Sequence, residues 1–215
     1  MLEKMGEFFD SRLAEYDEHM LNEIESAREF YPYTAGLLPM SGDARVLDLG
    51  CGTGLELCEY FKLNPSAEVI GIDLAPGMLS TLEKKLPDKN LTLILGSYFD
   101  LPFGEDKYDA AVSVESLHHF TAEEKIPLYS KLFRALKKNG YFVLTDYFAE
   151  SDKDEASFRA ELCRMKAERG IADGELYHFD TPLTVEHETE CLLAAGFESV
   201  EILGRWGATY TLIAK

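Results

Sequence analysis

The sequence predicts an α/β fold in which helices cover both faces of one open, mostly parallel sheet of seven strands. Two observations early in the 215-residue chain carry this prediction. The apolar segment 46–49 breaks into a glycine-rich turn and then a helix over about 55–62, as a buried parallel strand and its crossover helix do. The next apolar segment, 68–73, ends on Asp73, which a βαβ unit places beside that first turn.

The turn after the first strand has a spacing that discriminates between ligands. Gly50, Gly52 and Gly54 stand at alternate positions and can bring bare backbone against a ligand. The helix that follows offers unpaired N–H groups and a positive dipole end to an anionic group. A dinucleotide-binding fingerprint requires a third glycine three positions after the second, where this chain has Leu55. The spacing therefore disfavours NAD and FAD.

The other elements follow in order. Asp73 can accept hydrogen bonds from both hydroxyls of a ribose, a role compatible with capping the next helix, and Pro76 suits the first turn of that helix. Asn139-Gly140 is expected to end the helix before the fifth strand. A helix is expected at 185–195, and Gly204 and Gly207 are expected to bracket the last turn. After the second strand, strands are expected at 91–95, 108–114, 141–146, 197–203 and 206–214.

Composition excludes several classes of protein. The formal net charge of −18 disfavours a nucleic-acid partner, because phosphate backbones are bound by basic surfaces. The chain has no run of 18 apolar residues and no signal-peptide core, so we expect a cytoplasmic protein without a membrane span. Its four cysteines lack CxxC spacing, which indicates neither a disulfide framework nor zinc, and no metal site is expected.

Three features together resemble one family. The alternate glycines are preceded by Asp48 on the strand, Asp73 lies 25 residues later, and residues 115–120 read Glu-Ser-Leu-His-His-Phe. This combination resembles class I S-adenosylmethionine-dependent methyltransferases of the small-molecule type. The resemblance implies a Rossmann-like sheet, S-adenosyl-L-methionine as cofactor, S-adenosyl-L-homocysteine as product, and in-line methyl transfer to a small-molecule acceptor.

The resemblance also implies a set of cofactor-binding residues. Tyr16, in a Tyr-Asp pair, would cover the methionine end of the cofactor, and Asp48 would shape the loop. Ser97 occupies the place where the family often has the aspartate that binds the adenine amine, and Tyr98 would pack on the ring. The full expected set is Tyr16, Asp48, Gly50, Cys51, Gly52, Asp73, Leu74, Met78, Ser97, Tyr98, Val114 and Glu115.

A hydroxyl, ammonium or carbon acceptor would also need a group to take its proton. The candidates are His118 and His119, with His119 favoured as the residue that faces the pocket. Glu115 and Asp146 are weaker candidates. A carboxylate or thiolate acceptor would need no base.

The whole chain is expected to form one domain. Its parts would be a helical N-terminal cap (1–40), a cofactor-binding core (41–149), an inserted helical lid (150–183), and a C-terminal helix with a strand pair (184–215). An apolar stripe marks the cap: Phe9, Leu13, Tyr16, Met20 and Ile24. The insertion fits a lid over the sheet edge and a purely structural excursion equally well.

Two other functions stay open at this point. The fold could serve as a cofactor-binding module that acts as a protein partner without transferring a methyl group, or as a nucleotide-dependent oxidoreductase. The intact glycines and Asp73 argue against loss of the cofactor, and Leu55 argues against the oxidoreductase. The sequence identifies neither the acceptor nor whether the protein is a monomer or a homodimer.

Overall fold

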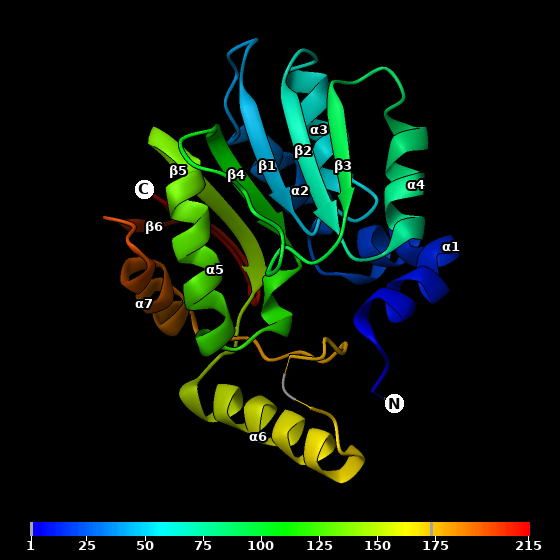
Figure 1. Ribbon diagram of the computed structural model, residues 1–215, viewed down its shortest axis with the longest axis vertical. Coiled ribbons are helices and arrows are strands. Elements are labelled where there is room, and N and C mark those ends of the chain that lie inside the picture. Colours follow the sequence, from blue (N-terminus) through cyan, green and yellow to red (C-terminus); the bar gives the residue numbers. More distant parts are fainter. Residues whose placement is uncertain (1, 173) are drawn as a thin grey trace.

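A computed structural model describes residues 2–172 and 174–215, and it confirms the expected α/β fold. Seven strands form one sheet in the order β3-β2-β1-β4-β5-β7-β6 (Figure 1). The inner strands are buried along nearly their whole length, as strands covered on both faces must be. The strands are β1 (Arg45–Leu49), β2 (Glu68–Asp73), β3 (Leu91–Leu95), β4 (Tyr108–Val114), β5 (Leu136–Tyr147), β6 (Val200–Trp206) and β7 (Thr209–Ala214).

Six of the seven strands run in one direction. β1 pairs in parallel with β2 and β4, while β7 runs antiparallel to both of its neighbours, β5 and β6. The order of the strands reverses at β1, because the chain builds outward from β1 through β2 to β3 and then returns to form β4 and β5 on the other side of β1. In such open sheets the ligand crevice lies beyond the carboxyl ends of the strands at the switch point.

Helices cover both faces of the sheet (Figure 1). One apolar core joins the sheet to α5 and α7, and a second joins the opposite face to α2, α3 and α4. Within the described ranges, no helix is both long and apolar enough to cross a membrane. The helices are α1 (Met5–Glu23), α2 (Ala27–Gly36), α3 (Leu55–Leu63), α4 (Pro76–Lys85), the short 3₁₀ turn η1 (Leu117–His119), α5 (Ala122–Ala135), α6 (Asp152–Arg169) and α7 (Val185–Ala195).

The expected helix end at Asn139-Gly140 is wrong. α5 ends at Ala135, and β5 begins at the next residue, so Asn139 and Gly140 lie inside the strand. Gly140 is needed there for space, because a Cβ atom on it would lie 2.9 Å from the carbonyl oxygen of Tyr108. The glycine marks a close approach of two strands, which a sequence pattern does not distinguish from a helix cap.

The last turn is also displaced from its expected place. Gly204, Arg205 and Trp206 belong to β6, and the turn consists of Gly207 and Ala208 alone. Gly207 has φ +59°, which suits the first position of a two-residue hairpin. Pairing with β7 continues through Trp206, so β6 extends past Gly204. The register of this pairing shifts between Ile202 and Gly204.

Two segments outside the sheet meet at its carboxyl edge. The start of α1 forms an isolated antiparallel bridge with the segment after α6, between Lys4 and Tyr177. The N–H of Met5 donates to Leu176, and the N–H of His178 donates to Glu3. α6 itself lies beyond the carboxyl ends of the strands (Figure 1). The N-terminal helix and the insertion therefore border the crevice together.

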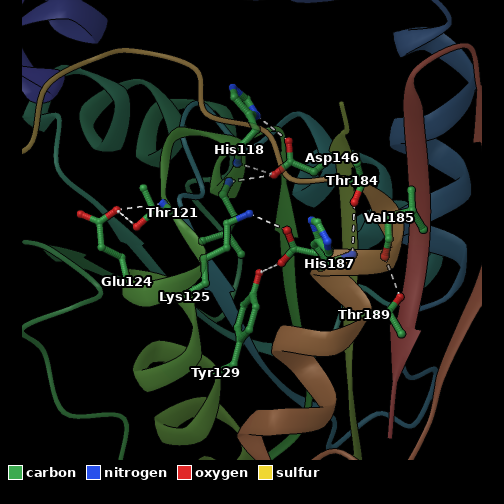
Figure 2. Close-up of polar contacts among 12 residues, drawn as sticks. His118, Thr121, Glu124, Lys125, Tyr129, Asp146, Thr184, Val185, His187 and Thr189 are labelled. Atoms are coloured by element: carbon green, nitrogen blue, oxygen red, sulfur yellow. Dashed lines mark hydrogen bonds and ion pairs between the residues drawn. The ribbon is translucent and has the colours of Figure 1, made fainter. Parts of the chain in front are cut away.

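A buried polar network joins α5 to α7. The Lys125 ammonium lies 2.5 Å from the Glu188 carboxylate, and the Tyr129 hydroxyl donates to the same carboxylate. Figure 2 shows Lys125 and Tyr129 pointing from α5 toward α7, with a dashed line leading from each side chain. The side chains of Lys125 and Glu188 are 2% and 0% exposed, so water cannot solvate either charge if its partner is removed. One partner alone would be a buried, uncompensated charge.

We expect Glu188→Leu to lower the free energy of unfolding by about 3–5 kcal/mol, because it strands the Lys125 charge in the core. The double variant Lys125→Met/Glu188→Leu should regain most of that loss. Urea denaturation measures both. The exposed pair Glu59–Lys62 is the control, since Glu59→Gln should change stability by at most about 1 kcal/mol. Equal losses in Glu188→Leu and Glu59→Gln would contradict this account.

Candidate active site

The glycine turn after β1 is held open by backbone conformation. Gly50, Gly52 and Gly54 have φ angles of +79°, +48° and +74°, in the left-handed region that favours glycine. The N–H groups of Gly50 and Cys51 donate to the carbonyl of Ile72. The N–H of Gly52 donates to Asp73 Oδ2 at 2.9 Å. The turn is thereby fastened to the end of β2.

The three glycines have different neighbours. A Cβ atom on Gly50 would lie 2.1 Å from Ser116 Oγ, and one on Gly54 would lie 2.3 Å from a methyl group of Leu82. A Cβ atom on Gly52 would meet nothing closer than the Tyr16 hydroxyl at 3.8 Å. Packing therefore accounts for Gly50 and Gly54, whereas Gly52 faces open space.

That open space is a narrow cleft between the turn and α1. Its enclosed volume is only about 40 Å³, far less than the several hundred Å³ of an ordinary ligand site. α1 supplies one wall through Met5, Phe9 and Tyr16. A ligand that fills the cleft must therefore displace this part of α1. The other lining residues are Gly50, Gly52, Asp73, Leu74, Met78, Tyr98, Glu115, Ser116 and His119.

Four residues of the expected cofactor set do not line this cleft. Asp48 is buried beneath the turn, Cys51 packs its sulfur against Gly71, and Val114 belongs to the core of the sheet. Ser97 Oγ accepts the N–H of Phe99, in the turn after β3. The sequence places all four in the right segments, but side-chain direction separates them from the residues on the wall.

Acidic groups surround the cleft. Burial raises the pKa of Asp73, against the effect of the N–H groups of Ala75 and Gly52 that its carboxylate accepts. Burial and then the charge of Asp146 raise the pKa of Glu115 to about 8. Beneath the turn, burial and the neighbouring Glu56 raise the pKa of Asp48 well above its ordinary value. A cation in the cleft would favour the charged form of each carboxyl group.

A larger cavity of about 550 Å³ adjoins the cleft. Phe9, Tyr16, Glu115 and His119 line both spaces, so the cavity and the cleft share one boundary. Its other walls come from three places: α1, the turn after β4 with the end of β5, and the segment after α6. These lining residues are Phe8, Arg12, Glu15, His19, Met20, Ile24, His118, Tyr147, His178 and Asp180.

The two adjacent histidines sit in different surroundings. Figure 2 shows the His118 ring beside Asp146. His118 Nδ1 lies 2.5 Å from Asp146 Oδ1, and the N–H groups of Leu117 and His118 donate to Asp146 Oδ2. Burial acts to lower the pKa of His118, but the Asp146 carboxylate outweighs it and raises that pKa to about 8. His118 is thus held in place by a buried carboxylate.

His119 makes no comparable hydrogen bond. Its Nδ1 lies 3.0 Å from Asp180 Oδ1, within ion-pair distance but not in a regular hydrogen bond, and neither buried atom has another hydrogen-bond partner in the described part of the chain. Burial, and then the charge of His118, lower the pKa of His119 to about 4. His119 borders both the cleft and the cavity, whereas His118 borders only the cavity.

Several residues that border these spaces or lie just beneath them were not expected from the sequence. Phe9 belongs to the apolar stripe, which indicated helix packing and not a ligand site. Ser116 lies inside the motif at 115–120, of which only Glu115 and the two histidines were expected at the site. Glu56, which is buried beside Asp48 beneath the turn and lines neither space, had no signal, since a charged residue in the first turn of a helix usually faces solvent. Asp180 had none either, because only the chain path after α6 brings it to the histidines.

Comparison with known proteins agrees with this geometry. Residues 46–140 match a family described as methyltransferase domain. Carboxy-S-adenosyl-L-methionine synthase of Campylobacter fetus is 26% identical over 99% of this chain and 95% of that protein. Demethylmenaquinone methyltransferase of Symbiobacterium thermophilum is 30% identical over 64% of this chain, which spans 56% of that protein.

A solved structure shows the same fold. The DhpI–SAH complex superimposes with a TM-score of 0.72 and 16% identity, over 97% of this chain and 93% of that one. The order of strands, the glycine turn with Asp73 at its side, and the family match lead to one conclusion. Residues 46–140 thus form a methyltransferase domain, and the whole chain has the fold of the class I S-adenosylmethionine-dependent methyltransferases, which it resembles along its full length.

Proposed function

We propose that this enzyme transfers the methyl group of S-adenosylmethionine to a small-molecule acceptor bound in the 550 Å³ cavity. One observation carries the proposal. The narrow cleft at the glycine turn and the larger cavity share the wall formed by Phe9, Tyr16, Glu115 and His119. A donor in the cleft and an acceptor in the cavity would therefore meet at this wall, as direct transfer requires.

The cleft fits the cofactor in two respects. Gly52 presents bare backbone to the open space, and Asp73 places a carboxylate on the wall, where it can accept the hydroxyls of a ribose. When bound, S-adenosylmethionine supplies an activated methyl group on a positively charged sulfur. The acidic groups Asp73 and Glu115 suit that charge. The remaining residues proposed to hold the cofactor are Tyr16, Gly50, Leu74, Met78 and Tyr98, with Asp48, Cys51, Ser97 and Val114 supporting them.

The cavity indicates the size of the acceptor. Its volume falls within the usual range for small-ligand sites, roughly 300–1,000 Å³. Aromatic rings of Phe8, Phe9 and Tyr147 line it together with histidines and carboxylates, which suits a partly apolar molecule. The acceptor named for demethylmenaquinone methyltransferase is also a small molecule and supports this class.

The chain's own groups have distinct tasks in this proposal. His119 is the candidate catalytic residue, because its unpartnered Nδ1 borders the space where the acceptor would lie. His118 is a positioning residue, since its ring is held by Asp146. α1 excludes water by closing the shared wall with Phe9 and Tyr16.

The proposed site needs no second subunit. Residues of one chain line both the cleft and the cavity, so a homodimer would not be required for activity. A cytoplasmic location forms part of the proposal. Its support is the absence of disulfides among the cysteines, all four of which the structure describes as free.

The first prediction from the proposed function concerns Gly52. Gly52→Val should lower cofactor affinity by at least about tenfold, because its side chain would enter the cleft. Gly170→Val is the matched control, since Gly170 also has positive φ, +62°, and has open space around it. Both variants should lose a similar amount of stability, about 1–2 kcal/mol, for the left-handed conformation. Calorimetry with S-adenosylhomocysteine measures affinity. Equal affinity in the two variants would remove the glycine turn from the site.

A second prediction concerns the N-terminal helix. Since α1 must move to admit the cofactor and then cover it, amides in residues 5–16 should gain protection from hydrogen exchange when S-adenosylhomocysteine binds. Amides of α7, which supplies no residue to the cleft, should not change. Protection confined to residues 50–54 and 73–79 would mean that α1 plays no part in closure.

A third prediction tests transfer itself. A screen of small hydroxyl, amine, thiol and carbon acceptors should find one that releases S-adenosylhomocysteine. With that acceptor, His119→Asn should lower kcat by about 100-fold or more and leave cofactor affinity nearly unchanged. His187→Asn is the control, because His187 lines neither the cleft nor the cavity. Unaltered turnover in His119→Asn would exclude His119 from catalysis.

A further inference from the structure

Three potential metal ligands converge at the wall of the large cavity. Asp180 Oδ1 lies 3.0 Å from His119 Nδ1 and 3.8 Å from His118 Nε2. One ligand atom from each residue lies within 4.8 Å of the other two. The residues come from two distant segments, the turn after β4 and the chain after α6, which the hydrogen bond from the Thr181 N–H to the His118 carbonyl brings together.

Two of these ligand atoms are buried without a hydrogen-bond partner. The His119 side chain is 3% exposed, and neither its Nδ1 nor Asp180 Oδ1 has a hydrogen-bond partner among the described residues. Buried polar atoms in native proteins are normally satisfied, so an unpaired histidine nitrogen facing an unpaired carboxylate oxygen calls for an explanation. A cation between the two atoms would satisfy both.

The spacing suits a tetrahedral ion. Metal–ligand bonds of 2.0–2.1 Å at tetrahedral angles place the ligand atoms about 3.3 Å apart. The separations from Asp180 Oδ1, 3.0 Å to His119 Nδ1 and 3.8 Å to His118 Nε2, lie on either side of this value. Small rotations of the side chains would bring the three atoms into position. Two imidazoles and one carboxylate favour zinc and related divalent transition metals over calcium or magnesium.

The surroundings orient one ligand in advance. Asp146 holds Nδ1 of His118, which leaves Nε2 directed at Asp180. Metal-binding histidines in proteins commonly have such a carboxylate behind them. Asp146 itself accepts the N–H groups of Leu117, His118 and Tyr147, so its oxygens are already occupied. This argues against the alternative set of Glu115, His118 and Asp146, although those atoms are also close together.

We propose that His118, His119 and Asp180 bind one divalent transition-metal ion, with a fourth coordination position open to the cavity. Three protein ligands and an open position are the arrangement found in catalytic rather than structural zinc sites. The cysteine pattern points away from zinc, but this set contains no cysteine. The role of the ion rests on the proposed function: it would bind the oxygen, nitrogen or sulfur of the acceptor and help that atom to lose its proton. His119 would then act on the acceptor as a ligand of the ion.

The test measures metal binding alone. The purified protein, stripped with a chelator, is titrated with Zn²⁺ in competition with a chromogenic chelator and, separately, with Co²⁺ while visible absorption is recorded. We expect one equivalent to bind and Co²⁺ to give the intense bands of a tetrahedral site. His119→Ala and Asp180→Asn should weaken Zn²⁺ binding by more than about 100-fold, and Asp146→Asn by about 10–100-fold.

The matched control is His187→Ala. His187 also contacts a carboxylate, Glu155, at 2.8 Å, but it lies outside the cavity. This variant should bind Zn²⁺ as the parent does. The absence of stoichiometric binding by the parent would overturn the proposal, as would unchanged affinity in His119→Ala or an equal loss in His187→Ala. If His119→Ala fails to fold, Asp180→Asn decides the case, because the Co²⁺ spectrum of the parent reports the coordination geometry but not the residues that bind. Because neither cofactor nor acceptor is present, metal binding without methyl transfer would refute only the proposed function.

Discussion

The arrangement of the site depends on one buried carboxylate at the end of β5. Asp146 is 2% exposed, and its two oxygens accept the backbone N–H groups of Leu117, His118 and Tyr147 as well as contacting the His118 ring. Burying a charge is costly unless it is paired and hydrogen-bonded, and here both conditions are met. The contacts fix the turn after β4 against the neighbouring strand, so the two histidines face the cavity.

A second carboxylate does similar work at the other strands. Asp73 accepts the N–H of Gly52 with one oxygen and that of Ala75 with the other, which joins the glycine turn to the start of α4. Parallel strands bring both aspartates to the same edge of the sheet, because all their carboxyl ends lie there. The donor side of the site is thus built around Asp73 and the acceptor side around Asp146.

The edge is covered by segments that the sheet does not determine. α1 is fastened to the core by polar contacts: Asp10 accepts the N–H of Gly77, and Asp17 contacts Thr53 and Lys85. Its beginning pairs with the segment after α6. α1 also places Met5 and Met20 in the two apolar cores, so the cover is held by apolar contacts near both of its ends as well as by these hydrogen bonds and ion pairs.

Local patterns were sufficient for the core of the fold. The bounds of β2, β3, β4 and α7 agree with the expected segments, and β2 and β4 leave the strongest signal because they are buried along nearly their whole length. The glycine turn and Asp73 were also evident, since their spacing is dictated by the backbone path of a βαβ unit. The sequence predicted a wrong boundary where strand pairing determines the structure. Asn139-Gly140 resembles a helix end, yet both residues lie in β5, which pairs with β4.

The sequence by itself determined the sheet, the glycine turn and the family resemblance, because each depends on residues close together in the chain. Only the tertiary structure decided which side chains line the cleft: Gly52 faces it, whereas Cys51 turns into the core. It also decided the partners of the two histidines. Asp180 lies more than 60 residues from His119 in sequence, and no local pattern records that the chain after α6 returns to the sheet edge. That return depends on backbone pairing with α1 and on the contact between Thr181 and His118, which are contacts between distant segments.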